Sequence, residues 1–404
     1  SKTIWFINDY AGSRYHGMEF RNYYFAKEFA KMGYSVYIIS ASYMHLFKKL
    51  PQVEDSYKFE NIDGINYLWL KVPKYGESTS KKRVLKWFIF SAKLFALPHS
   101  KMQKPDVVIA SPMAPFLAVP AYRLAKKYGA KFVYEVKDIW PLSIIELGGI
   151  SPKHPLIRAM SWCEKFAIKR ADVIVSSLFN YGEHLKRDLG IEKSFVWVNN
   201  GIDLDEVQNV EPLKKSVKEL IPNGKFIIGY TGTIGIANAL ETLCEAAKLL
   251  KDNDEIVFVI VGDGKEKQNL VDTYGNLDNI IFIEPIPKKE VQSMLLLFDV
   301  CYIGWNKEKI YNYGISANKI FDYMYSAKPI IHAYSGKGDL VKLAKCGVSV
   351  EAKNPKELAK AIEELYSSSE GSRREMGENG KRYVLEQFTY EKLSVKFLDA
   401  LFKE

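Results

Sequence analysis

Short apolar runs alternate with helical patterns along almost the whole chain, and this alternation restricts the fold more than any other feature. A continuous apolar run is typical of a strand that is buried on both faces of a parallel sheet. Parallel strands need a crossover between them, and a helix is the usual one. The sequence therefore predicts an α/β protein built on parallel sheets.

The apolar runs fall into two groups. In the first half we predict strands over residues 3–7, 35–40, 66–72, 106–110, 131–136, 172–176 and 194–198. In the second half we predict strands over residues 226–230, 256–261, 280–283, 300–304, 329–334 and 348–351. This number of strands is larger than an ordinary open sheet contains. We therefore predict two doubly wound, Rossmann-like domains. An Asn-Gly pair and a proline-flanked charged stretch place the boundary near residue 205, giving domains at 1–205 and 206–385.

Cysteine and histidine content argues against two kinds of site. The four cysteines, Cys163, Cys244, Cys301 and Cys346, form no Cys-x-x-Cys pair, and the chain has only six histidines. We therefore expect neither a disulfide framework nor a zinc cluster, and we expect a reducing compartment. The opening apolar stretch is too short for a signal peptide, and no apolar run reaches about 18 residues. These features predict a cytoplasmic protein without a spanning helix.

The most informative strand-to-helix junction is the sequence YNYGISANKIFDYM, which ends at Met324. Gly314 allows a sharp turn, and Ser316 is a good N-cap for a following helix. The backbone amides available to an anion there would be those of Ala317, Asn318 and Lys319. Asp322 lies one turn after Lys319, where a carboxylate can accept both hydroxyls of a ribose. A capped helix with a surface Lys–Asp pair is the alternative.

A second junction, IIGYTGTIGIANALETL, ends its strand in Gly229, Gly232 and Gly235. Glycines there allow backbone amides to approach a phosphate, although a tight turn explains them equally well. Residues 260–270 repeat the strand, glycine turn and helix, and simple turn chemistry is favoured for them. The Asp203-x-Asp205 pair has the form of a metal site but follows Asn-Gly in the interdomain loop, so no metal is expected.

Polar residues also follow two strands of the first half. Arg14, His16 and Arg21 surround the start of the first helix and are candidates for binding the acceptor, the two arginines because they could meet an anionic one. A loop histidine with no special role is the alternative for His16. Lys137 and Asp138 follow Glu135 at the end of the strand over 131–136. Three charges at one strand end favour a functional site, and a structural ion pair of Lys137 is the alternative.

The segment KKRVLKWFIFSAKLFALPHSKMQK, from Lys81 to Lys104, carries seven basic residues and no acid. The whole chain has a net charge of +9, which favours an anionic partner. Basic and aromatic residues together suit an anionic membrane surface, and an ordinary core helix with a solvated basic face is the alternative. No RNP, KH or zinc-knuckle pattern is present, so we expect no nucleic acid partner.

Taken together, the motifs resemble those of one family. The chain resembles the retaining nucleotide-sugar glycosyltransferases of the GT-B fold, family 4-like and of the bacterial O-antigen or capsule type, including L-fucosaminyltransferases. The resemblance spans nearly the whole chain and rests on the motifs HGMEFRNYYFAKEFAKMGYSVYIIS, EVKDIWPLS, NNGID, GYTGTIG, VGDG, NIIFIEPIP, SANKIFDYM, AKPII and MGENGKRYVLEQFTYEKL. It implies two Rossmann-like domains facing a central cleft. It also implies a C-terminal segment, residues 386–404, that crosses back to the first domain.

The resemblance further implies roles for individual residues. Ser316, Ala317, Asn318 and Lys319 would hold the donor diphosphate, with Gly232 and Thr233 lining the phosphates. Asp322 would bind the ribose and the backbone near Ile286 the base. Gly17 would approach the phosphates from the first domain, and no metal would be needed. Four positions depart from the family pattern: Gly314 replaces a glutamate, Thr233 and Asn238 replace basic residues, and Lys137 replaces a histidine.

These implications lead to one main hypothesis and two alternatives. The main hypothesis is transfer of a sugar, an N-acetylated hexosamine or deoxyhexosamine, from a UDP-sugar to a polyprenyl-diphosphate-linked saccharide. Lys319, Lys137 and Asp138 are the catalytic candidates, and the enzyme would sit on the inner face of the plasma membrane. A UDP-sugar 2-epimerase of the same fold is the first alternative. An inactive nucleotide-sugar-binding protein is the second, and Gly314 is its main support.

Overall fold

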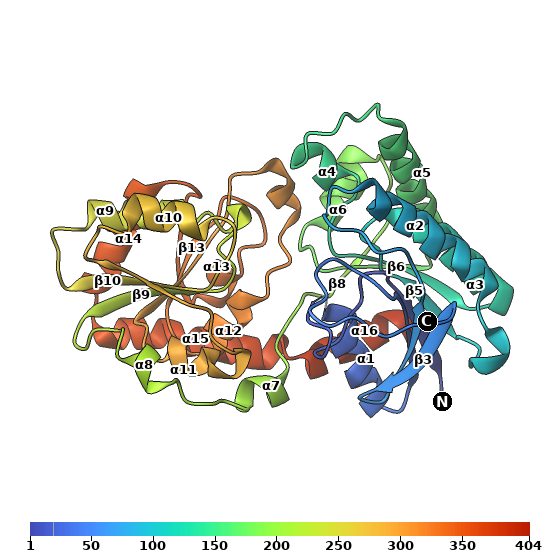
Figure 1. Cartoon of the computed structure of the whole chain (residues 1–404), viewed down its shortest axis with the longest axis horizontal. Coiled ribbons are helices and arrows are strands. Elements are labelled where there is room, and N and C mark those ends of the chain that lie inside the picture. The colour runs from blue at the N-terminus through green and yellow to red at the C-terminus, as the bar shows by residue number, and fades with distance from the viewer. Residues whose placement is uncertain (19) are drawn as a thin grey trace. The chain divides into compact units, whose positions relative to one another are not determined.

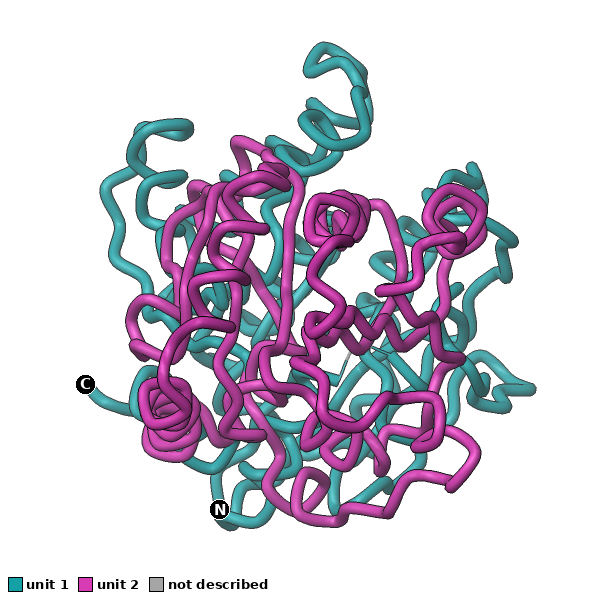
Figure 2. Tube along the Cα trace, turned by 90° about the vertical axis from the view of Figure 1, so that its left-hand side faces the viewer, with its two compact units in different colours: residues 1–200, 390–404 teal, residues 201–389 magenta. Residues whose placement is uncertain are grey.

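The structure is a computed structural model that describes residues 1–18 and 20–404, and these residues form two compact units (Figures 1 and 2). Unit 1 comprises Ser1–Asn200 and Tyr390–Glu404, and unit 2 comprises Gly201–Thr389. The boundary therefore follows Asn200 instead of residue 205, and the returning segment begins at Tyr390 instead of residue 386. Each unit is an α/β domain with its own sheet.

Unit 1 is built on an eight-stranded sheet with the strand order β3-β4-β2-β1-β5-β6-β7-β8. Its strands are β1 (Thr3–Ile7), β2 (Ser35–Ala41), β3 (Tyr57–Ile62), β4 (Ile65–Leu70), β5 (Val107–Ala110), β6 (Lys131–Val136), β7 (Val173–Ser176) and β8 (Val196–Trp197). All neighbours pair in parallel except β3 with β4. The central strands are buried, as their continuous apolar sequences predict.

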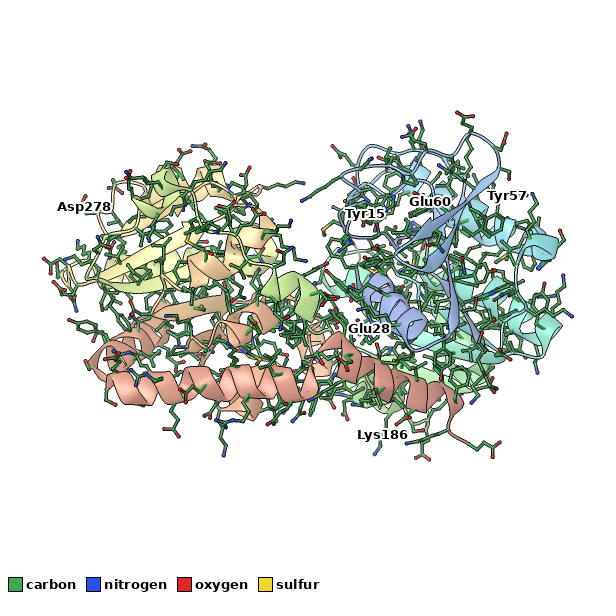
Figure 3. All side chains as sticks on the ribbon, turned by 90° about the horizontal axis from the view of Figure 1, so that it is seen from below. Tyr15, Glu28, Tyr57, Glu60, Lys186 and Asp278 are labelled. Carbon is green, nitrogen blue, oxygen red and sulfur yellow. The ribbon has the colours of Figure 1, made fainter. Side chains whose placement is uncertain are left out.

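Edge strand β3 was not among the predicted strands. Its sequence, YKFENI, mixes charged and apolar residues, because an edge strand with one exposed face has no continuous apolar run. It joins β4 through a two-residue turn in which Asp63 and Gly64 both have positive φ, and Asp-Gly is a strong hairpin signal. Glu60 on β3 (Figure 3) accepts a hydrogen bond from the indole of Trp69 on β4 at 3.0 Å.

Helices cover the sheet of unit 1. They are α1 (Arg21–Lys31), α2 (Lys81–Lys93), α3 (Ala118–Tyr128), α4 (Leu142–Glu146), α5 (Pro155–Arg170), α6 (Tyr181–Glu183) and α16 (Tyr390–Phe402). Short 3₁₀ turns are η1 (Leu94–Ala96), η2 (His99–Lys101) and η3 (Pro115–Leu117), and η4 (His184–Asp188) is a π-helix.

Helix α16 completes unit 1 by packing against α1. Tyr390 stacks on Tyr24 with ring centroids 4.6 Å apart. Phe397 meets Phe25 edge-on, with centroids 5.1 Å apart, and is fully buried. The last helix of the chain therefore closes a core that the first helix begins.

Unit 2 is built on a six-stranded parallel sheet with the order β11-β10-β9-β12-β13-β14. Its strands are β9 (Phe226–Thr231), β10 (Ile256–Val261), β11 (Ile280–Ile283), β12 (Val300–Gly304), β13 (Ile330–Ala333) and β14 (Gly347–Val350). Its helices are α7 (Leu204–Gln208), α8 (Lys215–Lys218), α9 (Leu240–Leu249), α10 (Lys267–Tyr274), α11 (Val291–Leu295), α12 (Lys319–Tyr325), α13 (Leu340–Ala344), α14 (Pro355–Ser367) and α15 (Glu370–Gln387), with 3₁₀ turns η5 (Ile236–Asn238), η6 (Lys288–Glu290) and η7 (Lys309–Tyr313).

In each sheet the strand order reverses at one place. In unit 1 the chain leaves β1 toward β2 and later returns to the other side of β1 as β5. In unit 2 the same reversal separates β9 from β12. Ligands of doubly wound sheets bind beyond the carboxyl ends of the strands at such switch points. The two switch points are therefore where side chains with chemical roles are expected.

Candidate active site

The unit 2 switch point contains an exposed glycine turn. Gly232 follows β9 with a φ of 139°, and both Gly232 and Thr233 are exposed. A Cβ at Gly232 would lie 2.8 Å from Cε and 3.0 Å from Nζ of Lys319, so the turn comes close to the end of that side chain. The backbone angle is the reason that the position favours glycine. The turn thus presents open backbone beside a lysine ammonium group.

The neighbouring glycine turn after β10 supports the first one. A Cβ at Gly262 would lie 1.9 Å from the carbonyl oxygen of Gly232, and one at Gly264 would lie 2.3 Å from that of Ile234. The amides of Gly232 and Ile234 donate to the backbone oxygens of Val261 and Asp263. The second turn therefore has a structural role at the switch point, which agrees with its interpretation as turn chemistry.

Lys319 lies at the start of α12 and is held by an aromatic residue. Its Nζ donates to the hydroxyl of Tyr230 at 2.9 Å and stands 4.7 Å from the centroid of that ring. Burial lowers the pKa of Lys319 to about 8. Within residues 1–18 and 20–404 no carboxylate pairs with this ammonium group.

Asp322 lies one turn further along α12 and is partly buried. Burial raises its pKa to about 6; the ammonium group of Lys288 opposes this shift and the carboxylate of Glu206 adds to it. Lys288 and Glu206 themselves pair at 2.9 Å. Because Lys319 bonds to Tyr230, the alternative of a surface Lys–Asp pair is not formed in the described chain.

The predicted helix start at Ser316 is wrong. Helix α12 begins at Lys319, and Asn318 occupies its N-cap position without a capping hydrogen bond from its side chain. In the first turn the amide of Phe321 donates a hydrogen bond to the backbone oxygen of Asn318 at 3.2 Å. Ser316 and Ala317 lie in the preceding loop, which leaves η7 through Gly314 at a φ of 107°.

The remaining donor-side candidates also lie in unit 2. The oxygen of Thr233 accepts a hydrogen bond from the hydroxyl of Tyr230 at 2.5 Å. The side chain of Asn238 accepts from the amide of Gly235 at 3.2 Å, so it closes the turn that leads to α9. Ile286 is partly buried in the loop after β11.

The unit 1 switch point contains a buried ion pair that the sequence did not reveal. Asp9 follows β1, and its carboxylate lies 3.6 Å from Nζ of Lys86, which also donates to the Asp9 backbone oxygen at 3.0 Å. Lys86 stands 3.9 Å from the ring centroid of Tyr10. Burial raises the pKa of Asp9 and lowers that of Lys86 to about 8.

This placement corrects part of the membrane prediction for residues 81–104. Lys86 is fully buried and therefore faces the sheet of unit 1. Arg83 donates to the hydroxyl of Tyr10 at 2.9 Å and to the oxygen of Ser78 at 2.9 Å. One turn of α2 separates the two side chains, so both lie on its inner face.

Arg21 and Glu135 belong to a buried polar network in unit 1. Arg21 lies 3.4 Å from the Glu135 carboxylate and donates to Asn200 at 2.9 Å and to the Val198 oxygen at 2.6 Å. Burial opposes ionisation of Glu135, but Arg21 and Lys137 outweigh it and keep its pKa low. Arg21 is buried and bonds within unit 1, whereas the sequence had suggested that it is open to an anionic acceptor.

Lys137 and Asp138 stand at the carboxyl end of β6. Nζ of Lys137 donates to the oxygen of Ser111 at 3.0 Å, which places it at the switch point next to β5. Asp138 is partly buried and accepts hydrogen bonds from the Trp140 indole, at 3.0 Å, and from the Ser143 hydroxyl. The structure thus brings Lys137 to the strand ends where Asp9 lies.

The other candidates of unit 1 lie in the loop before α1. Arg14 is exposed and pairs with Asp63 at 3.4 Å. His16 is buried against the ring of Trp69, its Nδ1 lies 2.7 Å from the Ser13 hydroxyl, and burial lowers its pKa. Gly17 has a φ of 110°, and a Cβ there would lie 2.9 Å from Cγ of Lys48.

The Asp203-x-Asp205 pair lies at the start of helix α7. Asp203 is the N-cap of α7 and accepts from the amide of Glu206 at 3.0 Å. Among residues 1–18 and 20–404, no cluster of three or more His, Cys, Asp or Glu side chains is arranged to hold a metal ion. In the same residues no helix combines the length and apolar character needed to cross a bilayer.

Comparison with known proteins decides the class of the chain. Residues 15–206 match the description Glycosyltransferase Family 4, and residues 213–383 match Glycosyl transferases group 1. The chain is a glycosyltransferase. Its two Rossmann-like domains are those of the GT-B fold, as predicted.

Similar proteins extend over most of this glycosyltransferase. WbjE of Pseudomonas aeruginosa, a probable glycosyltransferase, is 24% identical over 295 residues, which cover 70% of each chain. WcaI of Escherichia coli K12, a putative colanic acid biosynthesis glycosyl transferase, is 25% identical over 290 residues, 68% of this chain and 69% of that one. The Anabaena protein HepE, solved in complex with UDP, has a TM-score of 0.68 at 14% identity and covers 99% of both chains.

Sequence reasoning missed three residues of the two switch points. Tyr230 lies inside an apolar strand, where a tyrosine is unremarkable without its contact to Lys319. Asp9 and Lys86 are 77 residues apart, and their proximity follows only from the packing of α2 on the end of β1. The position of Asp9 directly after a buried strand was the one usable signal.

Proposed function

We propose that this glycosyltransferase moves a sugar, with retention of its anomeric configuration, from a UDP-sugar to a polyprenyl-diphosphate-linked saccharide. The observation that carries the proposal is the ammonium group of Lys319, which no carboxylate of the described chain neutralises, beside the exposed Gly232 turn. A diphosphate supplies the matching charge, and a charge-assisted hydrogen bond to it is strong in a partly buried site.

The relatives support the donor and the biological setting. HepE was solved with UDP, and WcaI is described as a colanic acid biosynthesis enzyme. We therefore propose a role in bacterial surface polysaccharide synthesis, of the O-antigen or capsule type. The transferred sugar is an N-acetylated hexosamine or deoxyhexosamine, as in the L-fucosaminyltransferases that the motifs resemble.

In the proposed reaction the bond between the anomeric carbon and the diphosphate oxygen breaks while the acceptor hydroxyl attacks from the same face, and the proton of that hydroxyl passes to the departing diphosphate oxygen. Lys319 stabilises the charge that develops on the departing UDP. Asp322 binds the ribose hydroxyls, and the backbone near Ile286 meets the base. Lys137 and Asp138 act on the acceptor. Because Lys319 supplies the positive charge, turnover is expected to continue in EDTA.

The test is incubation of the purified protein with UDP-sugars, first alone and then with a lipid-linked saccharide. Sugar transfer that needs the acceptor and keeps the anomeric configuration supports the proposal. Conversion of the donor sugar without acceptor would identify a 2-epimerase instead. UDP-sugar binding without any conversion would identify the inactive binding protein that Gly314 suggests.

We further propose that unit 1 docks on an anionic membrane through α2, α3 and α5, which lie together in Figure 1 and pack around η3. Their exposed basic residues are Lys81, Lys82, Arg123, Lys126, Lys127, Arg158, Lys165, Lys169 and Arg170. The single acid of the three helices, Glu164, is buried. Phe88, Phe95 and Trp162 expose 46%, 59% and 60% of their surface. Such a face is complementary to an anionic bilayer, where the enzyme would reach a lipid acceptor on the inner leaflet.

Sedimentation with vesicles tests this docking. Reversing Lys81, Lys82 and Lys165 to glutamate is expected to release the protein from anionic vesicles, because each basic residue contributes about 1 kcal/mol at such a surface. The matched control reverses Lys214, Lys218 and Lys251, three exposed lysines of unit 2, and keeps wild-type binding. Equal pelleting of both variants, or equal binding to neutral vesicles, would refute the proposal.

A further inference from the structure

The hydroxyl of Tyr230 joins two parts of the unit 2 switch point. It accepts a hydrogen bond from Nζ of Lys319 at 2.9 Å and donates one to the backbone oxygen of Thr233 at 2.5 Å. The ring itself is fully buried in the core of unit 2. A rigid, buried ring therefore bridges the lysine of α12 and the loop that follows β9.

The contacts leave Lys319 few other positions. Its ammonium group stands 4.7 Å from the Tyr230 centroid, within the range of a cation–π interaction. Gly232 lies beside both groups, because a Cβ there would come within 3.0 Å of Nζ and 3.3 Å of the Tyr230 hydroxyl. A lysine side chain has many rotamers in water, and this arrangement removes most of that freedom before any ligand arrives.

We propose that Tyr230 is a positioning residue that holds the ammonium group of Lys319 against the Gly232 turn, ready for the diphosphate of the donor. The phenol carries no charge at neutral pH, so it orients the lysine without neutralising it. A carboxylate in the same place would satisfy the ammonium group and compete with the ligand. The proposal rests on the proposed function only for the identity of the ligand, a nucleoside diphosphate.

The positioning role has a consequence for the pH dependence of binding. The ammonium group must be protonated to bind a diphosphate, and burial gives Lys319 a pKa of about 8 in the free protein. Affinity for UDP is therefore expected to fall as the pH rises above about 8, where Lys319 loses its proton. Removing the hydroxyl takes away an acceptor that favours the charged lysine, so the fall is expected to begin at lower pH.

The test replaces Tyr230 by phenylalanine, which keeps the ring and removes the hydroxyl. UDP affinity, measured by calorimetry between pH 7 and 9, is expected to weaken about three- to tenfold at pH 7, the range of one or two net hydrogen bonds. The control is Tyr302→Phe on the neighbouring strand β12. Its hydroxyl is buried in the same core and has no hydrogen-bond partner in the described chain, so UDP binding is expected to be unchanged.

A double-mutant cycle separates positioning from a structural effect. In a Lys319→Met background, Tyr230→Phe is expected to cause no further loss of UDP affinity, whereas a structural role would give the same loss in both backgrounds. Wild-type affinity and pH profile in Tyr230→Phe would overturn the proposal. If the protein binds inorganic pyrophosphate but not UDP, with the same dependence on Tyr230, the proposed donor is wrong and the positioning role stands. Binding of neither ligand overturns both.

Discussion

The two switch points place a lysine at equivalent edges of their sheets but treat its charge differently. In unit 1, Lys86 is fully buried and pairs with Asp9, so the protein neutralises the charge itself. In unit 2, Lys319 is partly buried and bonds only to the neutral hydroxyl of Tyr230 among the described contacts. A buried pair stabilises its surroundings only while both partners are present. Burying an unpaired ammonium group lowers the stability of the fold, and binding of an anion offsets that loss.

The comparison teaches which lysine is structural and which is available to a ligand. Burial lowers both pKa values to about 8, so this shift does not distinguish them. The distinguishing observations are the partner of each ammonium group and the exposure of the neighbouring backbone. Two substitutions test the distinction and a third tests the carboxylate that accompanies Lys319 on α12, beginning with the largest expected effect.

Lys86→Met is expected to lower the free energy of unfolding by about 3–5 kcal/mol, because it leaves the carboxylate of Asp9 buried without a counter-charge. Denaturant unfolding measures the change. Adding Asp9→Asn to the same chain removes the stranded charge and is expected to restore part of the loss. If the double variant is as unstable as the single one, the ion pair is not what holds the end of β1.

Lys319→Ala is expected to reduce sugar transfer about a hundredfold or more, the usual cost of losing one group that stabilises transition-state charge. Its stability at pH 7 is expected to equal or exceed that of the wild type. The folded pKa of about 8 lies below the unfolded value of 10.5, so wild-type stability rises with pH between these values and the gain of the variant shrinks there. Near-normal turnover, or a loss of stability like that of Lys86→Met, would contradict the conclusion that Lys319, unlike Lys86, is available to a ligand.

Asp322→Ala is expected to weaken UDP binding about ten- to hundredfold, which corresponds to charged hydrogen bonds of roughly 1.5–3 kcal/mol. The wild type is also expected to bind UDP less tightly below pH 6, where this carboxyl becomes protonated. Calorimetry with UDP and with its 2′,3′-dideoxy analogue checks the ribose role. If the variant loses as much affinity for the dideoxy analogue as for UDP, Asp322 does not bind the ribose hydroxyls.

The parallel strands and the glycine turns could be predicted because each depends on local sequence. A continuous apolar run such as the one in β10 requires burial on both faces, and Gly232 requires a backbone that only glycine adopts easily. Edge strand β3 was missed because its exposed face breaks the apolar run, although Asp63-Gly64 marked its turn. Ser316 was taken as an N-cap because its residue type is favourable, but the helix begins three residues later.

The polar contacts of the candidate site could not be predicted, because they join residues far apart in the sequence. Tyr230 and Lys319 are 89 residues apart, and Arg21 and Glu135 are 114 apart. Arg21 illustrates the consequence. In the sequence it is a cation near a strand end, whereas in the fold it pairs with the carboxylate of Glu135. Only the packed structure shows which charges remain available.

The return of α16 to unit 1 has a consequence for how the chain folds during synthesis. Unit 1 combines Ser1–Asn200 with Tyr390–Glu404, so its first part leaves the ribosome before the helix that covers Phe25 exists. Synthesis of the intervening residues takes roughly 10–40 s at about 5–20 residues per second. During that interval the aromatic face of α1 is without its native cover while unit 2 is being made. A nascent chain stopped before Tyr390 therefore leaves unit 1 unfinished, and synthesis of α16 is the step that completes it.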